Sequence, residues 1–373
     1  MQFIINVSVL VLLWIANLFN GTGLDSVYHV TLWTQRLTIL LFLASIGCKH
    51  QMPVERKDFF IFGSMIVIFL ASPAINGNGL RAGINYLWVF CLVYLLSNLI
   101  IDEKTMLWIG LIYGFLGFAI LFIFDYGSTL SGWNTNSIAM IGMHSYLIML
   151  VPFFKTQQIR NKVILISTLI LFSVLVFPTD SRSSILFGIL AALFAIGIIP
   201  EKTISKNNFT VFLWLMIPLI IAFFVINISK GSHMTALNLW SYQRFSKPLF
   251  NGRDELWIQG FDKLKTSPII GIGNFNAANW HNSAITCLVA TGIAGFAFWV
   301  ASFGQILNKV RYYLDDYLVT GCFISFIILY TQQSVELGFI SGNPTLLGYI
   351  LLGLMLGRVR CIEREGLCYD SEN

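Results

Sequence analysis

Three side chains of this 373-residue chain have the chemistry to handle an anionic group and a proton: Arg182 in PTDSRSS, Arg253 in NGRDELW and His281 in NWHNS. A guanidinium group forms paired hydrogen bonds to a phosphate or diphosphate. A neutral imidazole can act as a general base near neutral pH, or can orient a hydroxyl group. All three residues lie in polar stretches between long apolar runs. The sequence therefore predicts a site for an anionic ligand at the edge of a membrane.

Each of these residues also has a structural interpretation. Arg182 can pair with Asp180 or extend its side chain to lipid headgroups. Arg253 can pair with the acidic residues that follow it, or can mark the start of a helix. His281 can cap the helix that follows it, together with Asn282. The functional interpretation rests on the occurrence of all three in one chain.

The stretch around His281 predicts a ligand-binding loop. Gly271 and Gly273 permit a tight turn or a close backbone approach to a ligand, and asparagines follow at 274, 276 and 279. Amide groups bind sugar hydroxyls, and the indole face of Trp280 can stack on a pyranose ring. Asn282 is a further candidate for substrate binding. The alternative is a polar loop whose tryptophan anchors it at the membrane interface.

Arg36 is a substrate-binding candidate of a different kind. It lies about one or two turns inside a predicted span at 29–48, where a charge is costly and is usually kept for a partner. Its side chain can face the bundle and contact an anionic lipid headgroup. It can equally extend outward to the membrane interface.

The composition sets the class of protein that positions these residues. Hydrophobic residues make up 56% of the chain and charged residues 11%, and the mean hydropathy is +0.75. A soluble domain carries about 25% charged residues. Because lipid satisfies no backbone hydrogen bonds, the long apolar runs must form helices. The basic residues behind the net charge of +5 are spread among short loops, as membrane topology requires, and indicate no nucleic-acid partner.

We predict an all-α, polytopic bundle of about 12 transmembrane helices that forms a single integral membrane domain over residues 1–373. The polar segment 228–281 forms a longer loop within this domain. Inside it, Arg253 to Lys265 shows the three- and four-residue apolar spacing of a short amphipathic helix. The predicted spans are 3–20, 29–48, 59–75, 83–101, 106–124, 138–154, 163–179, 185–200, 210–227, 282–304, 317–333 and 345–358.

Basic residues predict the orientation of the bundle. With the N-terminus in the cytoplasm, the inner loops hold fourteen lysines and arginines, whereas the short outer loops hold only Arg81 and Arg182. This bias predicts that both termini are cytoplasmic. The 228–281 loop and the candidate site then lie on the outer face.

Three stretches of the outer face resemble a known family. His281-Asn282, followed after nine residues by GIAG, is similar to the His-Asn-x9-Gly-x-x-Gly motif of bacterial O-antigen ligases. GRDELW with the later SPIIGIG resembles the segment before that motif, and TDSRSSILFGIL resembles a T-x-S-R-x-x-x-L loop. The three occur in the family's order over roughly residues 175–300. They resemble the superfamily of O-antigen ligases, O-antigen polymerases and protein O-oligosaccharyltransferases.

This resemblance implies an enzyme of the bacterial inner membrane that moves a glycan from undecaprenyl diphosphate to an acceptor hydroxyl on the periplasmic face. The lipid diphosphate is already an activated leaving group, so the reaction implies no metal, nucleotide sugar or other cofactor. By the family pattern, Arg182 and Arg253 hold the diphosphate and stabilise its departing charge. His281 then activates or positions the acceptor hydroxyl, which belongs to a lipid A core or to another glycan.

Several functions remain in competition. The His-Asn motif favours a ligase, which joins O-antigen to the lipid A core. The outer segment is short for a protein that also grips a lipid A core, so a polymerase that joins repeat units is the alternative. A lipid-linked glycan flippase or transporter is more distant, because the ionisable residues gather on one face and the halves of the chain do not resemble each other. The ordered set of two arginines and a histidine disfavours a scaffold without chemistry.

Overall fold

The computed structural model describes residues 33, 36, 56–99, 102–127, 135–154, 158–179, 181–231, 233–336, 338–341 and 345–371. Within these ranges the chain forms helices and no strand, which confirms the predicted all-α class. The predicted span 3–20, nearly all of the span 29–48, and Asp180 lie outside the described residues.

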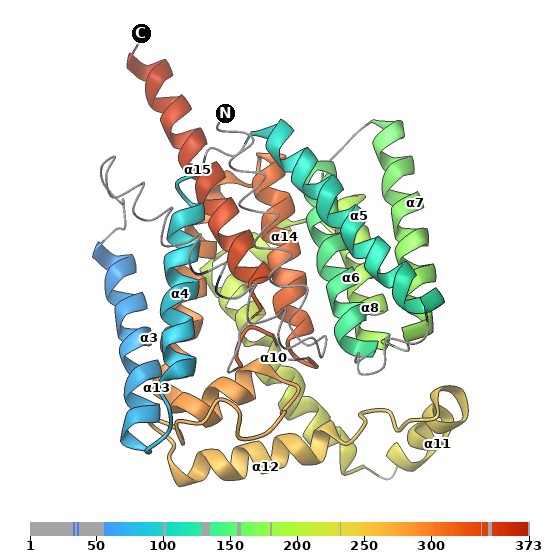
Figure 1. The fold of residues 1–373 in the computed structure, drawn as a ribbon, viewed down its shortest axis with the longest axis vertical. Helices are drawn as coiled ribbons and strands as arrows, with labels where there is room; N and C mark the ends of the chain where they lie inside the picture. The colour runs from blue at the N-terminus through green and yellow to red at the C-terminus, as the bar shows by residue number, and fades with distance from the viewer. Residues whose placement is uncertain are drawn as a thin grey trace.

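Helices that run along one another form the body of the protein (Figure 1). Each predicted span from residue 59 onward overlaps one of them, and α15 runs well past its predicted end. They are α3 (Arg56–Ile75), α4 (Arg81–Leu96), α5 (Glu103–Gly127), α6 (Thr135–Leu150), α7 (Ile159–Val176), α8 (Arg182–Ala195), α10 (Asn208–Ser229), α13 (Ser283–Val310), α14 (Tyr317–Gln332) and α15 (Leu347–Ser371). The short α9 (Lys202–Ser205) and the 3₁₀ turns η1 (Val151–Phe153), η2 (Phe177–Thr179) and η3 (Arg311–Tyr313) lie between them.

Four segments among the described residues are long and apolar enough to cross a membrane: Glu103–Ile123, Ile159–Thr179, Asn208–Ser229 and Ser283–Tyr313. The other apolar helices are shorter, so the count of about twelve spans stays a prediction. The most apolar windows of α7 and α10 are only 28% and 33% buried, whereas that of α13 is 72% buried. The first two helices therefore present apolar side chains outward, as helices that face lipid do.

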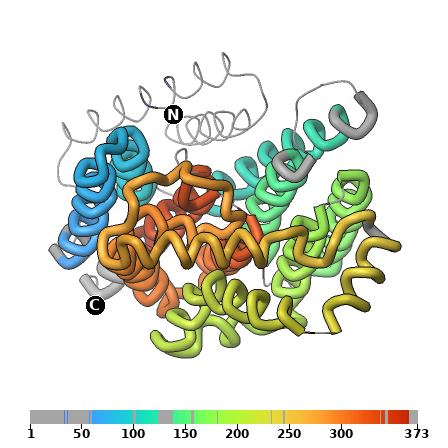
Figure 2. Tube along the Cα trace, turned by 90° about the horizontal axis from the view of Figure 1, so that it is seen from below, coloured from blue at the N-terminus to red at the C-terminus, as the bar shows by residue number. Residues whose placement is uncertain are grey.

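Two further helices, α11 (Met234–Phe245) and α12 (Arg253–Thr266), lie across one end of the bundle (Figures 1 and 2). We call this the α12 end. α12 is the predicted amphipathic helix: Trp257 and Gly260 are buried, and the Lys265 side chain is 77% exposed. The end of α15 lies at the opposite end of the bundle (Figure 1).

The helix α14 lies at the centre of the bundle. Every residue from Leu318 to Gln332 is buried, and α14 packs against α6, α8, α10 and α15. A helix that is apolar on all faces is buried on all faces. The segment that leaves α14 therefore emerges at the middle of the α12 end.

The helix α13 is interrupted at Gly292, where φ is 69° and ψ is −172°. Glycine alone adopts this conformation routinely. A Cβ atom there would lie 2.2 Å from the carbonyl oxygen of Ile269, so the position also lacks space for a side chain. The Gly-x-x-Gly motif thus begins at a break in the helix.

The segment 268–273 completes the hydrogen bonding that the break disrupts. It runs beside the break, where two of its N–H groups donate to carbonyls of α13 and two of its carbonyls accept from N–H groups of α13. Buried backbone groups require such partners. The bonds are Ile272 to Val289 (2.8 Å), Gly273 to Ala290 (2.9 Å), Ile293 to Pro268 (2.9 Å) and Ala294 to Ile269 (3.1 Å).

Gly271 and Gly273 allow the segment to pack closely against its neighbouring helices. Both have a φ of 70°. A Cβ at 271 would lie 2.4 Å from the carbonyl carbon of Ala290, and one at 273 would lie 2.5 Å from the carbonyl oxygen of Ser72. The close approach that the sequence predicted is thus made to α13 and α3, and contact with a ligand stays a prediction.

We expect Gly292→Ala to lower the stability of the protein by more than about 2 kcal/mol, because it combines a left-handed backbone with a clash against Ile269. The measurement is the thermal unfolding of purified protein in detergent. Gly63→Ala is the matched control, since a Cβ there meets nothing within 4 Å. Equal melting temperatures for the two variants would contradict this account of the break.

Candidate active site

A buried carboxylate lies at the α12 end, just after α14. The Glu336 side chain is 7% exposed, and its Oε1 accepts hydrogen bonds from Arg253 Nη2 and from Ser183 Oγ, each at 3.2 Å. Its Oε2 lies 3.7 Å from His281 Nδ1. One carboxylate therefore contacts two of the predicted catalytic residues, Arg253 and His281. It also contacts Ser183, which follows the third, Arg182, in the sequence. We call Ser183, Arg253, His281 and Glu336 the Glu336 cluster.

The start of α13 fixes the backbone of His281. Asn282 is the N-cap of this helix and accepts a hydrogen bond from the Ile285 N–H at 3.1 Å. Its amide nitrogen donates to the carbonyl oxygens of Pro218 and Ser334 at 2.8 and 3.0 Å. The cap thus joins α13, α10 and the segment after α14. His281 itself has a φ of 48°, a left-handed conformation that is uncommon outside glycine.

The segment that carries Glu336 is bound to the same helix start. The Ser283 N–H donates to the Gln333 carbonyl, and Ser283 Oγ donates to Gln333 Oε1, both at 3.0 Å. The same Oε1 accepts from the Phe339 N–H at 3.0 Å. These bonds flank Glu336 in sequence, so they hold its carboxylate beside His281.

The helix α12 brings Arg253 to the same place. Arg253 is its first residue, and Trp257, one turn later, donates from Nε1 to the carbonyl oxygen of Trp280 at 2.7 Å. Arg253 pairs with Glu336 across the fold rather than with the acidic residues that follow it in sequence. The Arg253 Nε is buried and has no hydrogen-bond partner among the described residues, so one donor of the guanidinium remains available.

The helix α8 brings Arg182 close to this cluster. Arg182 is the first residue of α8, and its Nη1 donates to Ser241 Oγ of α11 at 3.4 Å. The next residue, Ser183, is the one that binds Glu336. Arg182 and Arg253 thus both stand at helix N-termini, where unpaired N–H groups and the helix dipole favour an anion.

Two predicted substrate-binding residues border the Glu336 cluster but are buried. Trp280 is 2% exposed and packs in an apolar cluster with Trp257 and Ile285, which covers its ring faces. Asn282 is 0% exposed, and its amide makes the three hydrogen bonds described above. In this structure both residues position His281, and direct contact with a substrate stays a prediction for each.

The remaining predicted residues lie apart from the Glu336 cluster. Arg36 donates from Nη2 to Asn85 Oδ1 of α4 at 2.7 Å. Gly271 and Gly273 lie against α13 and α3. The structure therefore gathers the predicted catalytic residues more closely than the predicted substrate-binding residues.

Glu336 was not among the residues that the sequence predicted for the site. It is the only acidic residue between the predicted spans 317–333 and 345–358. A charge on a short loop between two spans is costly and is usually kept for a partner, which is the argument that singled out Arg182.

The described residues contain no group of three or more His, Cys, Asp or Glu that could hold a metal ion.

These features define an α-helical membrane protein with an arginine-containing polar site at one end of its bundle. The family model described as O-antigen ligase matches residues 167–300, from within α7 to within α13. This match confirms the resemblance seen in the sequence and supports an O-antigen ligase/polymerase-type membrane glycosyltransferase family for the chain. The matched range includes Arg182, Arg253 and His281 and ends before Glu336. No curated protein matches the chain.

We expect Asn282→Ala to destabilise the protein by about 2–3 kcal/mol, because it removes a helix cap and takes the Asn282 donor away from the carbonyl oxygen of Ser334. Asn207→Ala is the control: Asn207 caps α10 through one backbone bond in an exposed setting, so its loss should cost about 1 kcal/mol. Thermal unfolding of both purified variants gives the comparison. A smaller loss for Asn282→Ala than for Asn207→Ala would contradict the scaffolding role of Asn282.

Proposed function

We propose that this protein is an O-antigen ligase, which transfers a glycan from undecaprenyl diphosphate to a hydroxyl of the lipid A core. The observation that carries the proposal is the Glu336 cluster, which joins an arginine and a histidine at one polar site of a membrane protein. The family match and the His-Asn motif support this function. The reaction would take place at the periplasmic face of the inner membrane, with both termini in the cytoplasm, as the distribution of basic residues favours.

The two arginines supply the chemistry for the diphosphate. In our proposal, the Arg182 and Arg253 guanidinium groups bind its oxygens, and the first turns of α8 and α12 add partial positive charge. The buried Arg253 Nε, which has no partner among the described residues, is a donor that such a ligand would satisfy. As the bond between the anomeric carbon and the phosphate oxygen breaks, the electron pair leaves with undecaprenyl diphosphate, and the arginines stabilise the added charge.

His281 acts on the acceptor in this mechanism. The acceptor hydroxyl oxygen forms the new bond to the anomeric carbon, and its proton passes to the imidazole. Glu336 lies 3.7 Å from Nδ1, so it orients the ring and stabilises the imidazolium that forms. Because it also binds Arg253, Glu336 is a positioning residue that holds the acceptor and donor groups at a fixed separation.

A polymerase that joins repeat units would use the same chemistry with a glycan as the acceptor. The shortness of the 228–281 segment favours this alternative, since a lipid A core requires a large contact surface. A flippase or transporter is less well supported, because Arg253, His281 and Glu336 meet at the α12 end of the bundle rather than along a path through it.

We expect Arg253→Ala, His281→Ala and Glu336→Gln each to reduce glycan transfer about a hundredfold or more. The measurement is a lipopolysaccharide gel from a deletion strain complemented with each variant. Glu336→Gln keeps the shape of the side chain and removes its charge, so it tests the ion pairs themselves. Lys265→Ala, which removes an exposed ion pair on the same α12 helix, should restore a wild-type ladder.

The deletion strain separates the two enzymes. Loss of a ligase leaves long polymer on undecaprenyl diphosphate and none on the lipid A core, whereas loss of a polymerase leaves a single repeat unit on the core. A normal ladder in a deletion strain without a redundant enzyme would contradict both, and transport would then be tested by a flux assay in liposomes.

A further inference from the structure

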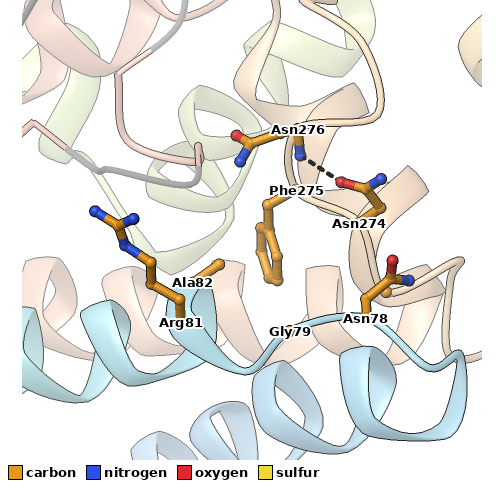
Figure 3. Close-up of a pocket in the computed structure, with 8 residues that line it drawn as sticks. Asn78, Gly79, Arg81, Ala82, Asn274, Phe275 and Asn276 are labelled. Carbon is orange, nitrogen blue, oxygen red and sulfur yellow. Dashed lines mark hydrogen bonds between the residues drawn. The ribbon is translucent and has the colours of Figure 1, made fainter.

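A polar cavity of about 280 Å³ lies at the α12 end, and no residue of the Glu336 cluster lines it. One wall is the turn between α3 and α4, with Asn78, Gly79 and Arg81. The other wall is the segment 273–276, and Figure 3 shows the Asn274 side chain turned toward the backbone of Asn276. This volume is close to the lower limit of about 300 Å³ for ligand pockets and accommodates a monosaccharide unit.

The cavity is a built feature of the fold. Its Phe275 ring is 4% exposed and packs on Phe69 and Tyr86, with ring centroids 5.4 and 5.5 Å apart. Asn78 Nδ2 donates to the carbonyl oxygen of Ile272 at 3.0 Å, which joins the two walls. A packed aromatic ring and a hydrogen bond between the walls therefore form this cavity.

Arg81 is the charged group of this cavity. Its side chain is exposed and makes no hydrogen bond or ion pair in the described part of the chain. It is the first residue of α4, whose N-cap Leu80 makes no side-chain cap bond, so the helix dipole adds to the positive character. In Figure 3, Arg81 and Asn276 lie on one side of the Phe275 ring, and Asn274 and Asn78 lie on the other.

The amide groups supply hydrogen bonding for hydroxyls. Asn274 uses its Oδ1 to accept from the Asn276 N–H at 2.9 Å, and Asn78 uses its Nδ2 in the bond to Ile272. These contacts orient both side chains, which line the cavity, and leave Asn274 Nδ2 and Asn78 Oδ1 without a hydrogen-bond partner in the described part of the chain. One amide thus offers a donor and the other an acceptor, which is the pattern that sugar hydroxyls match.

We propose that this cavity binds a saccharide unit that carries an anionic group, with Arg81 on the anion and the asparagines on the hydroxyls. The proposal rests on the proposed function, because it names a property of the glycan that the enzyme handles. The anionic sugar can belong to the donor glycan or to the acceptor. A carboxylate or a phosphate would each form paired hydrogen bonds with the guanidinium.

The cavity is connected to the Glu336 cluster through the backbone after Glu336. Tyr86, which packs on Phe275, donates from its hydroxyl to the carbonyl oxygen of Ser341 at 2.9 Å and accepts from the Ser341 N–H at 2.8 Å. Four residues separate Glu336 from Ser341. A glycan bound in the cavity therefore lies on the same face as the reacting groups, and its binding fixes the position of the sugar chain.

The test measures binding of trigalacturonic acid and of its methyl ester, which keeps the hydroxyls and removes the charges. Purified full-length protein in nanodiscs is titrated by saturation-transfer difference NMR. We expect wild type to bind the acid at least about tenfold more tightly than the ester, which is the effect of a hydrogen bond to a charged group. Arg81→Ala should abolish this preference, and Arg81→Lys should retain part of it.

Arg160→Ala is the matched control, because Arg160 is an exposed arginine in the first turn of α7 and outside both sites. It should leave the preference for the acid unchanged. Equal affinity of wild type for acid and ester, or an unchanged preference in Arg81→Ala, would overturn the proposal. Loss of the preference in Arg160→Ala would overturn it as well, since the effect would then reflect net charge.

Kinetics of transfer identify the source of the anionic sugar. A raised KM of Arg81→Ala for the lipid-linked donor, with kcat retained, supports the donor glycan, and a raised KM for the acceptor supports the acceptor. Unchanged KM values for both would overturn the role in transfer. If wild type transfers no glycan yet binds trigalacturonic acid through Arg81, the proposed function fails and the binding site stands.

Discussion

The arrangement of the α12 end depends on one buried carboxylate. An ionised carboxylate without partners would cost several kcal/mol at this depth, so Glu336 requires the groups that surround it. Those groups come from the starts of α8 and α12 and from His281 just before α13, which are far apart in the sequence. Their attraction to Glu336 brings three helix starts to one place. An arriving diphosphate would compete with Glu336 for the Arg253 guanidinium, which couples donor binding to the position of His281.

A break in α13 makes this arrangement possible. Gly292 interrupts the helix, and the segment 268–273 supplies the missing hydrogen bonds, so the polar loop is attached to a helix that is otherwise mostly buried. The same segment follows α12 and continues into the wall of the Arg81 cavity at 273–276 and then to His281. The Gly-x-x-Gly motif is therefore required for the packing of the loop against α13. The His-Asn pair lies at the start of the same helix.

The sequence predicted the all-α class of the fold and named three residues, Arg182, Arg253 and His281, that lie in or next to the Glu336 cluster. Hydropathy located the helices because lipid requires every backbone group to be satisfied within a helix. Arg182 was singled out because a charge held near the bilayer is costly. The three- and four-residue spacing of apolar residues predicted the amphipathic helix that begins at Arg253. Glu336 was missed because its partners are 55 to 153 residues away, and nothing local indicates which charges meet. Trp280 was predicted to face a sugar, but its burial depends on packing with Trp257 and Ile285, which no residue pattern reveals.

The most direct test of the central claim is a double-mutant cycle between Arg253 and Glu336, measured as the rate of glycan transfer by purified protein in liposomes. If the pair acts as one unit, the double variant Arg253→Ala, Glu336→Gln should be little slower than the slower single variant. Losses that multiply, so that the double variant shows the product of the two single effects, would mean that the residues act independently. That result would contradict the account of Glu336 as the group that holds the site together.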